Sequence, residues 1–350
     1  MDLDGTNMLI TGGTGSFGKR FISRVLKRYK PNRLIIFSRD ELKQFELRQQ
    51  YPTSEYQNLR MFVGDVRDRD RLYRALDGVD IVVHAAALKQ VPTAEYNPLE
   101  AIKTNILGAA NLIDAAIDRN VKKVMALSSD KAANPVNLYG ATKLCADKLF
   151  VAANAYSGAH KTRFSVVRYG NVVGSRGSVI PYFLAQRPTG CLTITDPRMT
   201  RFLITLDQGV DFVLNCMETM RGGEICVPKI PSVRIMDLAR VIAPECKHKF
   251  IGVRPGEKLH EVMVPEDDAR LTIEFDDHYL IQPSHSYWDK KAFLDGRPQN
   301  PCPDGFKYSS DTNTQWLTDE EISGMVEMVT ADPDIDVMPK PTEPSFILGS

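Results

Sequence analysis

The chain has 350 residues, 43% of them hydrophobic and 25% charged, and its 44 Lys and Arg balance its 44 Asp and Glu. This composition is typical of a soluble globular protein with one large or two modest domains. The charge balance offers no basic field to nucleic acid or anionic lipid, and no apolar run approaches the ~20 residues that span a bilayer. No signal peptide precedes the first fold motif. The sequence therefore predicts a cytoplasmic protein that binds neither nucleic acid nor membrane.

The six cysteines are scattered along the chain without C-x-x-C spacing. That distribution argues against both a zinc site and a disulfide framework. We therefore expect no metal.

A glycine-rich turn, TGGTGSFG at residues 11–18, follows the first expected strand and leads into an amphipathic stretch. Strand, glycine turn and helix in this order form the dinucleotide fingerprint, in which the glycines let the backbone approach a pyrophosphate at a helix N-terminus. The spacing G-x-x-G-x-x-G resembles that of short-chain dehydrogenase/reductases of the extended type.

The second expected strand, residues 34–37, ends at Ser38, Arg39 and Asp40, with Lys43 one turn later. A carboxylate at this strand end binds the ribose hydroxyls of NAD, whereas an arginine accommodates the 2′-phosphate of NADP. Arg39 offers such a phosphate its planar fork and Lys43 adds a point charge. The sequence therefore favours NADP, and Asp40 keeps NAD as an alternative.

The third and fourth expected strands also end in residues suited to a cofactor. Asp65 can accept a hydrogen bond from an adenine amino group, and the small residues 85–87 form a wall for a flat ligand. Lys89 follows where substrate and nicotinamide should meet, and a later helix carries Asn105. The repeated alternation of strand and helix predicts an α/β fold with a doubly wound parallel (Rossmann) sheet.

The most informative stretch is VMALSSDKAANPVNLYGATK, residues 124–143. Its apolar start predicts a central parallel strand. Ser128, Ser129, Asp130 and Lys131 then lie where that strand ends, which is where ligands bind in open α/β sheets. We place the active site there.

On the helix that follows, Tyr139 and Lys143 are four residues apart and share one face. A neighbouring cation stabilises a phenolate. Lys143 and an oxidised nicotinamide are therefore expected to lower the pKa of Tyr139 from about 10 to about 7. Tyr139 is then a general base near neutral pH.

Beyond residue 170 the pattern loosens into loops rich in Gly and Pro. Three of them, at 175–178, 196–202 and 254–258, carry arginines, which suit a doubly charged ligand such as a nucleotide diphosphate. The expected domains are a dinucleotide-binding domain of residues 1–170 and about 201–228, a smaller C-terminal substrate-binding lobe of about 171–200 and 229–330, and a flexible tail of 331–350.

Several segments together resemble one family closely: TGGTGSFG, FSRDELKQ, GDVRD, HAAALKQVPTAEYNP, LSSDKAANPVNLYGATK, RYGNVVGSRGSV, DPRMTRF and RPGEKLHE. They resemble the inverting (5-inverting) UDP-N-acetylglucosamine 4,6-dehydratases, extended short-chain dehydrogenase/reductases that begin pseudaminic acid synthesis. The resemblance runs from residue 8 to about residue 317. It implies an NADP-dependent lyase that acts on UDP-N-acetylglucosamine, forms a homo-oligomer (dimer or hexamer) and supplies glycosylation of flagellin or other surface structures.

The residues and the resemblance together give three sets of expected site residues. The catalytic set is Ser129, Asp130, Lys131, Tyr139 and Lys143. The cofactor set is Gly12, Thr14, Gly15, Ser16, Phe17, Gly18, Ser38, Arg39, Asp40, Lys43, Asp65, Val66, Ala85, Ala86, Ala87, Lys89, Asn105, Tyr139, Lys143 and Val172. The substrate set is Lys89, Ser128, Ser129, Asn171, Arg176, Ser178, Thr200, Arg201, Arg254 and Glu257.

Within these sets, the pair Asp130 and Lys131 selects the reaction. Retaining dehydratases that resemble this chain carry Asp-Glu here, so lysine in the glutamate position suggests a different base and inversion at C5. Ser129 stands where the family motif has threonine, and either hydroxyl can hydrogen-bond the C4 oxygen of the sugar.

The mechanistic hypothesis assigns one proton to each group. Tyr139 removes the C4 hydroxyl proton as hydride passes to NADP, and a neutral Lys131 removes the C5 proton while Asp130 assists loss of water from C6. Return of hydride to C6 and reprotonation of C5 from the opposite face give UDP-2-acetamido-2,6-dideoxy-beta-L-arabino-hex-4-ulose.

Two alternatives stay open. A UDP-hexose 4-epimerase uses the same tyrosine but needs no acid–base pair, and two charges beside the sugar would then be costly. A non-catalytic NADP-binding sensor would be expected to lose its catalytic residues, yet Ser129, Tyr139 and Lys143 are all present.

Overall fold

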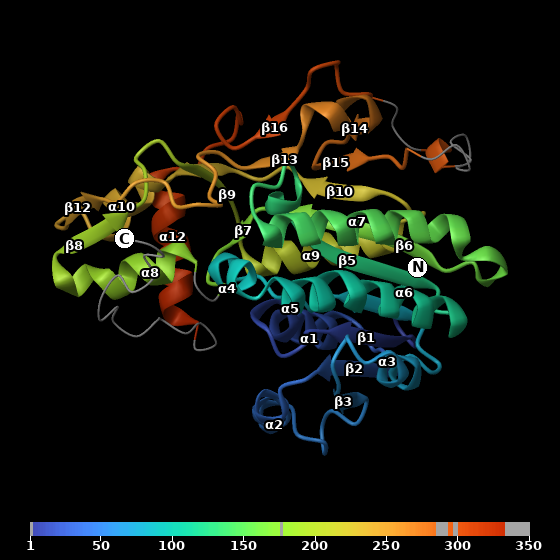
Figure 1. Cartoon of the computed structure of the whole chain (residues 1–350). Helices are drawn as coiled ribbons and strands as arrows, with labels where there is room; N and C mark the ends of the chain where they lie inside the picture. The colour runs from blue at the N-terminus through green and yellow to red at the C-terminus, as the bar shows by residue number, and fades with distance from the viewer. Residues whose placement is uncertain (1–2, 176–177, 285–292, 297–299, 333–350) are drawn as a thin grey trace. The chain divides into compact units, whose positions relative to one another are not determined.

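The computed structural model describes residues 3–175, 178–284, 293–296 and 300–332 (Figure 1). The chain divides into two compact units. The first comprises residues 1–169, 207–229 and 262–308, and the second comprises residues 170–206, 230–261 and 309–350.

The first unit contains a large, mostly parallel sheet with the strand order β14-β15-β10-β6-β5-β4-β1-β2-β3. Its strands are β1 (Asn7–Thr11), β2 (Arg33–Ser38), β3 (Leu59–Val63), β4 (Ile81–His84), β5 (Lys123–Ser129), β6 (Arg163–Tyr169), β10 (Ile225–Pro228), β14 (Thr272–Glu274) and β15 (His278–Ile281). From β10 to β3 neighbouring strands are parallel, and β15 and β14 add antiparallel pairs at one edge. The predicted α/β class and doubly wound parallel sheet are confirmed.

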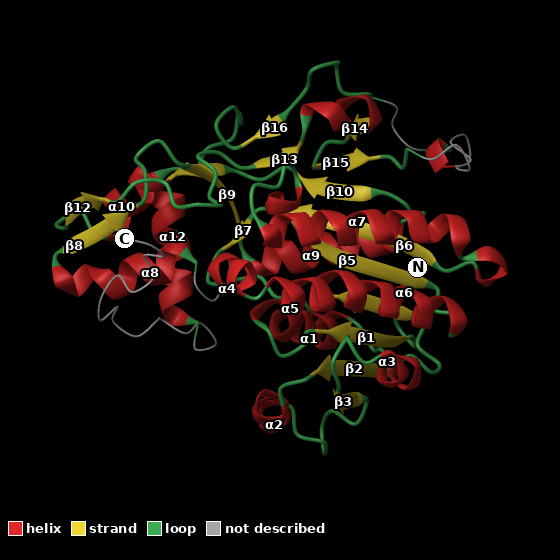
Figure 2. Ribbon diagram, viewed as in Figure 1, coloured by secondary structure: helices red, strands yellow, loops and turns green. Residues whose placement is uncertain are grey.

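Helices cover both faces of this sheet, with α6 and α7 toward the viewer in Figure 2. The helical segments of the first unit are α1 (Ser16–Arg28), α2 (Glu41–Gln50), α3 (Arg69–Ala75), α4 (Val91–Tyr96), α5 (Pro98–Ile102), η1 (Lys103–Leu107), α6 (Gly108–Asp118), η2 (Asp130–Ala132), α7 (Leu138–Tyr156), η3 (Gly158–His160), α9 (Leu206–Thr219) and η5 (Glu266–Leu271). Because helices lie on both sides, the central strands are continuous apolar runs rather than alternating ones. In β4 all four residues, Ile81–His84, are buried.

The order in which successive strands join the sheet reverses at β1. From β1 the sequence continues outward to β2 and β3, then returns to β4 on the other side of β1. Ligands in open α/β sheets bind at such a switch point, outside the carboxyl ends of the strands. A ligand is therefore expected outside the carboxyl ends of β1, β4 and β5.

The second unit is built from short strands and helices around its own core. Its elements are β7 (Asn171–Val172), α8 (Val179–Gln186), η4 (Arg187–Thr189), β8 (Cys191–Ile194), β9 (Thr200–Ile204), β11 (Ser232–Arg234), α10 (Ile235–Ile242), β12 (Lys247–Phe250) and α12 (Asp319–Ala331). Strands β11, β9 and β7 form one sheet, and β12 and β8 form a second. The core includes Phe183, Leu203, Leu238 and Ile322, all nearly inaccessible to solvent. A further small sheet joins β13 (Val262–Val264) and β16 (Tyr308–Ser309).

The observed units differ from the expected domains in two segments. Residues 262–308 belong to the first unit, because β14 and β15 extend the large sheet from β10 by antiparallel pairing. Residues 201–206 belong to the second unit, because β9 pairs with β7 and β11. Of the expected tail, 333–350 lies outside the described residues, and Ala331 ends helix α12.

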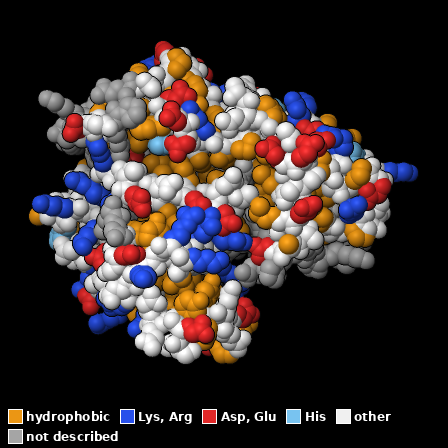
Figure 3. Space-filling model, turned by 180° about the vertical axis from the view of Figure 1, so that it is seen from behind, with side chains coloured by type: hydrophobic (Ala, Val, Ile, Leu, Met, Phe, Trp, Pro, Cys, Tyr) orange, Lys and Arg blue, Asp and Glu red, His pale blue; other side chains and the backbone are white. Residues whose placement is uncertain are grey.

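Charged side chains of both signs are interspersed over the face displayed in Figure 3, as equal numbers of acidic and basic residues would suggest. Within the described ranges, no helix combines the length and apolar character needed to cross a bilayer.

Candidate active site

The glycine turn after β1 leaves room for a ligand at one position and brings backbone segments together at two others. Gly12 has φ of 65°, and a Cβ there would lie 2.9 Å from the amide nitrogen of Ala86. At Gly15, the N-cap of α1, a Cβ would meet nothing nearer than the Gly12 oxygen at 3.3 Å, and no side chain caps the helix. The exposed first-turn amides of α1 suit an anion such as a pyrophosphate.

Gly18 packs directly against the backbone of Gly13, because a Cβ at Gly18 would lie 2.3 Å from the backbone oxygen of Gly13. Both partners are backbone, so neither can rotate away. We expect Gly18→Ala to lower the free energy of unfolding by about 1–3 kcal/mol through overpacking. Urea denaturation measures it, with Gly209→Ala in α9 as control. A Cβ at Gly209 meets nothing within 4 Å, so that change should instead stabilise by about 0.5–1 kcal/mol. Equal stability of the two variants would contradict the close-packing argument.

At the end of β2, the side chains of Asp40 and Lys43 are engaged with each other. Asp40 caps α2 by accepting a hydrogen bond from the Lys43 amide at 3.0 Å, and its carboxylate also pairs with the Lys43 ammonium. Arg39 projects a side chain that is 58% exposed. Of the two groups weighed for the cofactor ribose, the arginine is therefore the more accessible.

Asp65, expected at the adenine, is held by arginines. The Arg67 guanidinium lies 2.7 Å from its carboxylate, and Arg39 lies at 3.9 Å. Burial raises the pKa of Asp65, but the hydrogen bonds and charge of Arg67, with the charge of Arg39, lower it on balance. Asp65 is thus a carboxylate bound by Arg67, with Arg39 within ion-pair distance at the end of β2.

The loop after β4 is positioned by Thr11. Its hydroxyl accepts hydrogen bonds from the amides of Ala85 and Ala86, each at 3.2 Å, and contacts Nδ1 of His84 at 2.9 Å. Because the oxygen already accepts twice, its proton goes to His84. Burial, and secondarily the charge of Lys143, lower the pKa of His84 to about 3. His84 is therefore a neutral structural residue with a defined partner.

Asn105, expected to contact the cofactor, is instead occupied within the protein. Its side chain accepts from the Leu88 amide at 2.8 Å and donates to the Leu88 carbonyl at 2.9 Å and the Thr142 hydroxyl at 3.0 Å. Asn105 lies in η1, a π-helical turn of the kind that often marks functional sites. Through Leu88 and Thr142, Asn105 links α7 to the loop that carries the exposed Lys89.

Tyr139 is fixed at the start of α7. The Asn137 side chain caps the helix by accepting from the Gly140 amide at 2.8 Å, and Glu95 accepts from the Leu138 amide at 2.6 Å. The ring packs against Ala94 in a small apolar cluster and is 8% exposed. One turn later, the buried Lys143 ammonium donates to the carbonyl of Leu127 in β5.

The electrostatics of Tyr139 differ from the prediction. Burial raises its pKa to about 12; the charge of Lys131 and a hydrogen bond with Ser129 act to lower it, and Asp130 acts to raise it. The expectation that Lys143 lowers this pKa is wrong for the protein groups alone, because that ammonium binds the Leu127 carbonyl. Lys131 is the cation that acts on the phenol.

Ser129, Asp130 and Lys131 form a compact cluster where β5 passes into η2. The Ser129 hydroxyl donates to Oδ1 of Asp130 at 2.7 Å, and the Lys131 ammonium lies 3.1 Å from the same oxygen. Asp130 is fully buried, its Oδ2 has no hydrogen-bond partner among the described residues, and the Lys131 side chain is 25% exposed. A Cβ at Gly140 would lie 2.2 Å from the Lys131 backbone oxygen, so η2 packs directly on α7. An acid–base pair thus stands beside Tyr139.

Ser128, expected to contact substrate, is buried and turned to α7. Its hydroxyl donates to Oδ2 of Asp147 at 2.8 Å, and Asp147 pairs with Arg168 at 3.3 Å. Sequence reasoning missed Asp147 and Arg168. A signal was available, because Tyr139, Lys143 and Asp147 recur every four residues on α7.

Tyr169 was also missed. It lies opposite Ser129 in the β5–β6 register and is buried. Burial, with a smaller contribution from Tyr139, raises the pKa of its phenol. It therefore contributes a neutral hydroxyl beside the cluster.

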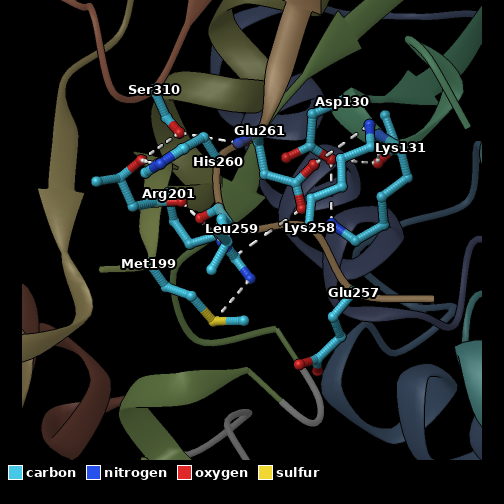
Figure 4. A network of polar contacts seen from close by, with 12 residues as sticks. Asp130, Lys131, Met199, Arg201, Glu257, Lys258, Leu259, His260, Glu261 and Ser310 are labelled. Atoms are coloured by element: carbon cyan, nitrogen blue, oxygen red, sulfur yellow. Dashed lines mark hydrogen bonds and ion pairs between the residues drawn. The ribbon is translucent and has the colours of Figure 1, made fainter. Parts of the chain in front are cut away.

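In the second unit, Thr200 and Arg201 belong to one polar network (Figure 4). The Thr200 hydroxyl contacts Nδ1 of His260 at 2.9 Å and Oγ of Ser310 at 2.7 Å. Arg201 donates to the carbonyls of Thr200 and Leu259 at 2.7 and 3.0 Å. The Thr200 hydroxyl, expected to bind substrate, is thus engaged within the unit.

The remaining expected contacts of this unit lie on different elements. Arg254 is exposed and lies 3.9 Å from Glu257. Asn171 and Val172 form β7 and are half-buried, and Ser178 precedes α8 as its N-cap. Arg176 lies outside the described residues.

Comparison with known proteins identifies the family. Residues 8–283 match the family described as polysaccharide biosynthesis protein. A protein of Campylobacter jejuni (strain 81-176), named UDP-N-acetylglucosamine 4,6-dehydratase (inverting), is 55% identical over 329 residues, which cover 92% of this chain and 98% of that protein. The chain belongs to this family of inverting dehydratases.

Other relatives carry different names. A protein of Rickettsia akari named UDP-glucose 4-epimerase is 45% identical over 282 residues, 78% of this chain and 82% of that protein. Among solved structures, the X-ray structure of Pen from Bacillus thuringiensis has a TM-score of 0.85 and 36% identity, covering 94% of this chain and 99% of that one. The inverting dehydratase family thus shares its fold with these proteins along most of the chain.

Proposed function

We propose that this protein is a UDP-N-acetylglucosamine 4,6-dehydratase that inverts C5 and uses NADP as an internal hydride carrier. The observation that carries the proposal is the Asp130–Lys131 ion pair beside Tyr139 at the end of β5. Oxidation at C4 needs a base at the hydroxyl, and elimination between C5 and C6 needs a further acid and base. The cluster contains one group for each task.

The glycine turn fits a dinucleotide, since its space lies at the uncapped N-terminus of α1. A bound nicotinamide would accept hydride from C4 and return it at C6. Residues 11–18 would hold the pyrophosphate, and Arg39 would contact a 2′-phosphate. NADP is favoured over NAD because the Asp40 carboxylate is already committed to Lys43 and to capping α2.

Arg39→Ala tests this preference for NADP. We expect NADPH affinity to fall about 10- to 100-fold, from ~1.5–3 kcal/mol for a hydrogen bond to a charged group, while NADH affinity changes little. Fluorescence titration with both dinucleotides measures it. Arg74→Ala, an exposed arginine on α3, changes net charge equally and should bind as the wild type does. Parallel losses for NADPH and NADH would remove Arg39 from 2′-phosphate recognition.

The ion pair in the structure and the neutral pair required for elimination differ only in which of the two groups holds one proton. In the structure Lys131 faces a carboxylate at 3.1 Å, which favours the ammonium. Transfer of that proton to Asp130 gives a neutral amine and a carboxylic acid. Lys131 then removes the C5 proton while Asp130 protonates the departing C6 hydroxyl, so the pair starts and ends with the same proton inventory.

The wider context of the proposal comes from the family. The product would be UDP-2-acetamido-2,6-dideoxy-beta-L-arabino-hex-4-ulose, made in the cytoplasm by a homo-oligomer as the first step of pseudaminic acid synthesis for flagellin or another surface structure. The name of the Campylobacter protein supports the substrate, the dehydration and the inversion, whereas the compartment, the oligomer and the pathway are what the resemblance to the family implies.

A UDP-hexose 4-epimerase is the second candidate, favoured by the names of the rickettsial relatives. An epimerase would use Tyr139 but has no elimination step for Asp130 and Lys131. A buried carboxylate paired with a lysine would then lie unused beside the sugar at a cost in desolvation. The dehydratase accounts for both groups.

Proton NMR of the purified protein with UDP-N-acetylglucosamine in heavy water tests the proposal. We expect a C6 methyl signal, deuterium at C5 and couplings of the L-arabino configuration. A methyl signal with retained configuration would keep the dehydratase but reject inversion through Lys131. Formation of UDP-N-acetylgalactosamine would identify an epimerase, and an unchanged sugar would reject this substrate.

A further inference from the structure

A buried group of charges lies directly behind the candidate catalytic cluster, within the first unit. The Asp147 and Arg168 side chains are each only 2% exposed and approach to 3.3 Å. Arg168 also donates to the carbonyl of Met263 at 3.0 Å, while its Nε has no hydrogen-bond partner among the described residues. A buried ion pair with an unsatisfied donor contributes little net stability compared with apolar packing. Stability alone is therefore a weak reason for this pair.

Asp147 connects this pair to two groups of the candidate site. It lies one helical turn after Lys143 and two turns after Tyr139, so the three share one face of α7. Its Oδ2 accepts the Ser128 hydroxyl at 2.8 Å, and Ser128 precedes Ser129 at the end of β5. Lys143 in turn donates to Leu127, one residue before Ser128. The carboxylate thus braces both the helix and the strand that carry the catalytic groups.

We propose that Asp147 is a positioning residue for the reaction, which keeps the buried Lys143 in its cationic form and fixes the end of β5 through Ser128. This inference rests on the proposed function, because it concerns how the same site holds its cofactor and its base. It assigns Asp147 no contact with the substrate or the cofactor.

The surroundings of Lys143 leave Asp147 as its stabilising anion. On β4, His84 is neutral, and on β6 the Arg168 cation is paired with Asp147. In η2, Asp130 and Lys131 pair with each other, and on α7 itself Tyr139 is a neutral phenol near pH 7.

The pKa directions agree with this arrangement. Burial lowers the pKa of Lys143, and the charge of Asp147 opposes that change. Burial raises the pKa of Asp147, against the charges of Arg168 and Lys143 and the hydrogen bonds from Ser128 and Arg168. On the alkaline side, where Lys143 loses its proton, Asp147 is ionised. Removing its charge lowers the pKa of Lys143, so the lysine becomes neutral at a lower pH.

The test is the pH dependence of dinucleotide binding, which needs no turnover. NADPH and NADH are titrated by fluorescence into wild type and Asp147→Asn from neutral to alkaline pH. The asparagine keeps the shape and an acceptor for Ser128. We expect near-wild-type affinity at neutral pH and an alkaline loss of affinity that begins at lower pH. At the alkaline pH at which the affinity of the wild type for the dinucleotide is half its value at neutral pH, the variant should bind the dinucleotide several-fold more weakly than the wild type.

Two further variants separate the charge effect from a folding defect. Ser128→Ala breaks the hydrogen bond but keeps the carboxylate of Asp147. Its alkaline limb, which is the pH range over which dinucleotide affinity falls, should therefore coincide with that of the wild type. If Asp147→Asn does not fold, the double variant Asp147→Asn with Arg168→Gln removes both charges of the pair. Its limb should be displaced in the same direction but by less, because removing the Arg168 cation acts in the opposite direction.

A folded Asp147 variant with the wild-type limb overturns the proposal, and so does a displaced limb in Ser128→Ala. The proposed function fails separately, when wild-type protein binds a dinucleotide but leaves UDP-N-acetylglucosamine unchanged. The binding titration then still decides the role of Asp147.

Discussion

Lys131→Ala is expected to bind NADP and UDP-N-acetylglucosamine but to release water at a rate at least ~100-fold below that of the wild type, the usual contribution of a positioned acid or base. The truncation removes the amine that would take the C5 proton and leaves Asp130 without the cation at 3.1 Å. Appearance of the C6 methyl signal measures elimination, and deuterium at C5 of recovered substrate measures proton removal.

A second substitution at the same position distinguishes proton transfer from electrostatics. Lys131→Arg keeps a cation beside Asp130 and Tyr139, but a guanidinium stays protonated and cannot act as the base. We expect it to stop elimination as fully as alanine does. Lys148→Ala, an exposed lysine of α7, serves as the control with normal turnover. Wild-type elimination by the arginine variant would show that Lys131 acts only through its charge.

The sheet could be predicted from the sequence because its signals are local. Each central strand is a short apolar run followed by a turn or a polar group, and the glycine turn at 11–18 marks the first strand-to-helix junction. The edge strands β14 and β15 could not be predicted this way. Strand β15 joins β10 by antiparallel pairing between segments about fifty residues apart, and β14 pairs locally with β15. The register between β10 and β15 leaves no periodic trace in either segment.

The candidate site, too, could be predicted from the sequence only in part. The sequence grouped Ser129, Asp130, Lys131 and Tyr139, because a strand end and the next helix necessarily lie close together. It could not determine hydrogen-bond partners, which depend on side-chain direction. Ser128 was expected at the substrate but donates to Asp147. Similarly, Asn105 was expected at the cofactor but binds the Leu88 backbone.

Tyr139→Phe is expected to reduce oxidation at C4, and with it turnover, by about 100- to 10,000-fold, because no other group replaces the phenol as base. The phenylalanine ring retains the packing against Ala94 and Ala101 and loses only the hydroxyl with its Ser129 contact. Thermal unfolding should therefore change little, which separates a chemical loss from a structural one. Transient near-ultraviolet absorbance of the reduced nicotinamide measures the oxidation step. A variant that still forms it at the wild-type rate would exclude Tyr139 as the base.

The pH dependence of that oxidation step gives a sharper test of Tyr139, because its two neighbours act in opposite directions. Its rate should rise with pH as the phenol loses its proton, along a limb that follows the pKa of Tyr139. The charge of Lys131 lowers this pKa and that of Asp130 raises it. Lys131→Met should therefore move the limb to higher pH, and Asp130→Asn should move it to lower pH. Both variants remove one charge from the same ion pair, so general disruption of the site would displace the two limbs alike. Opposite displacements are expected only if the limb reports a phenol lying between the two groups.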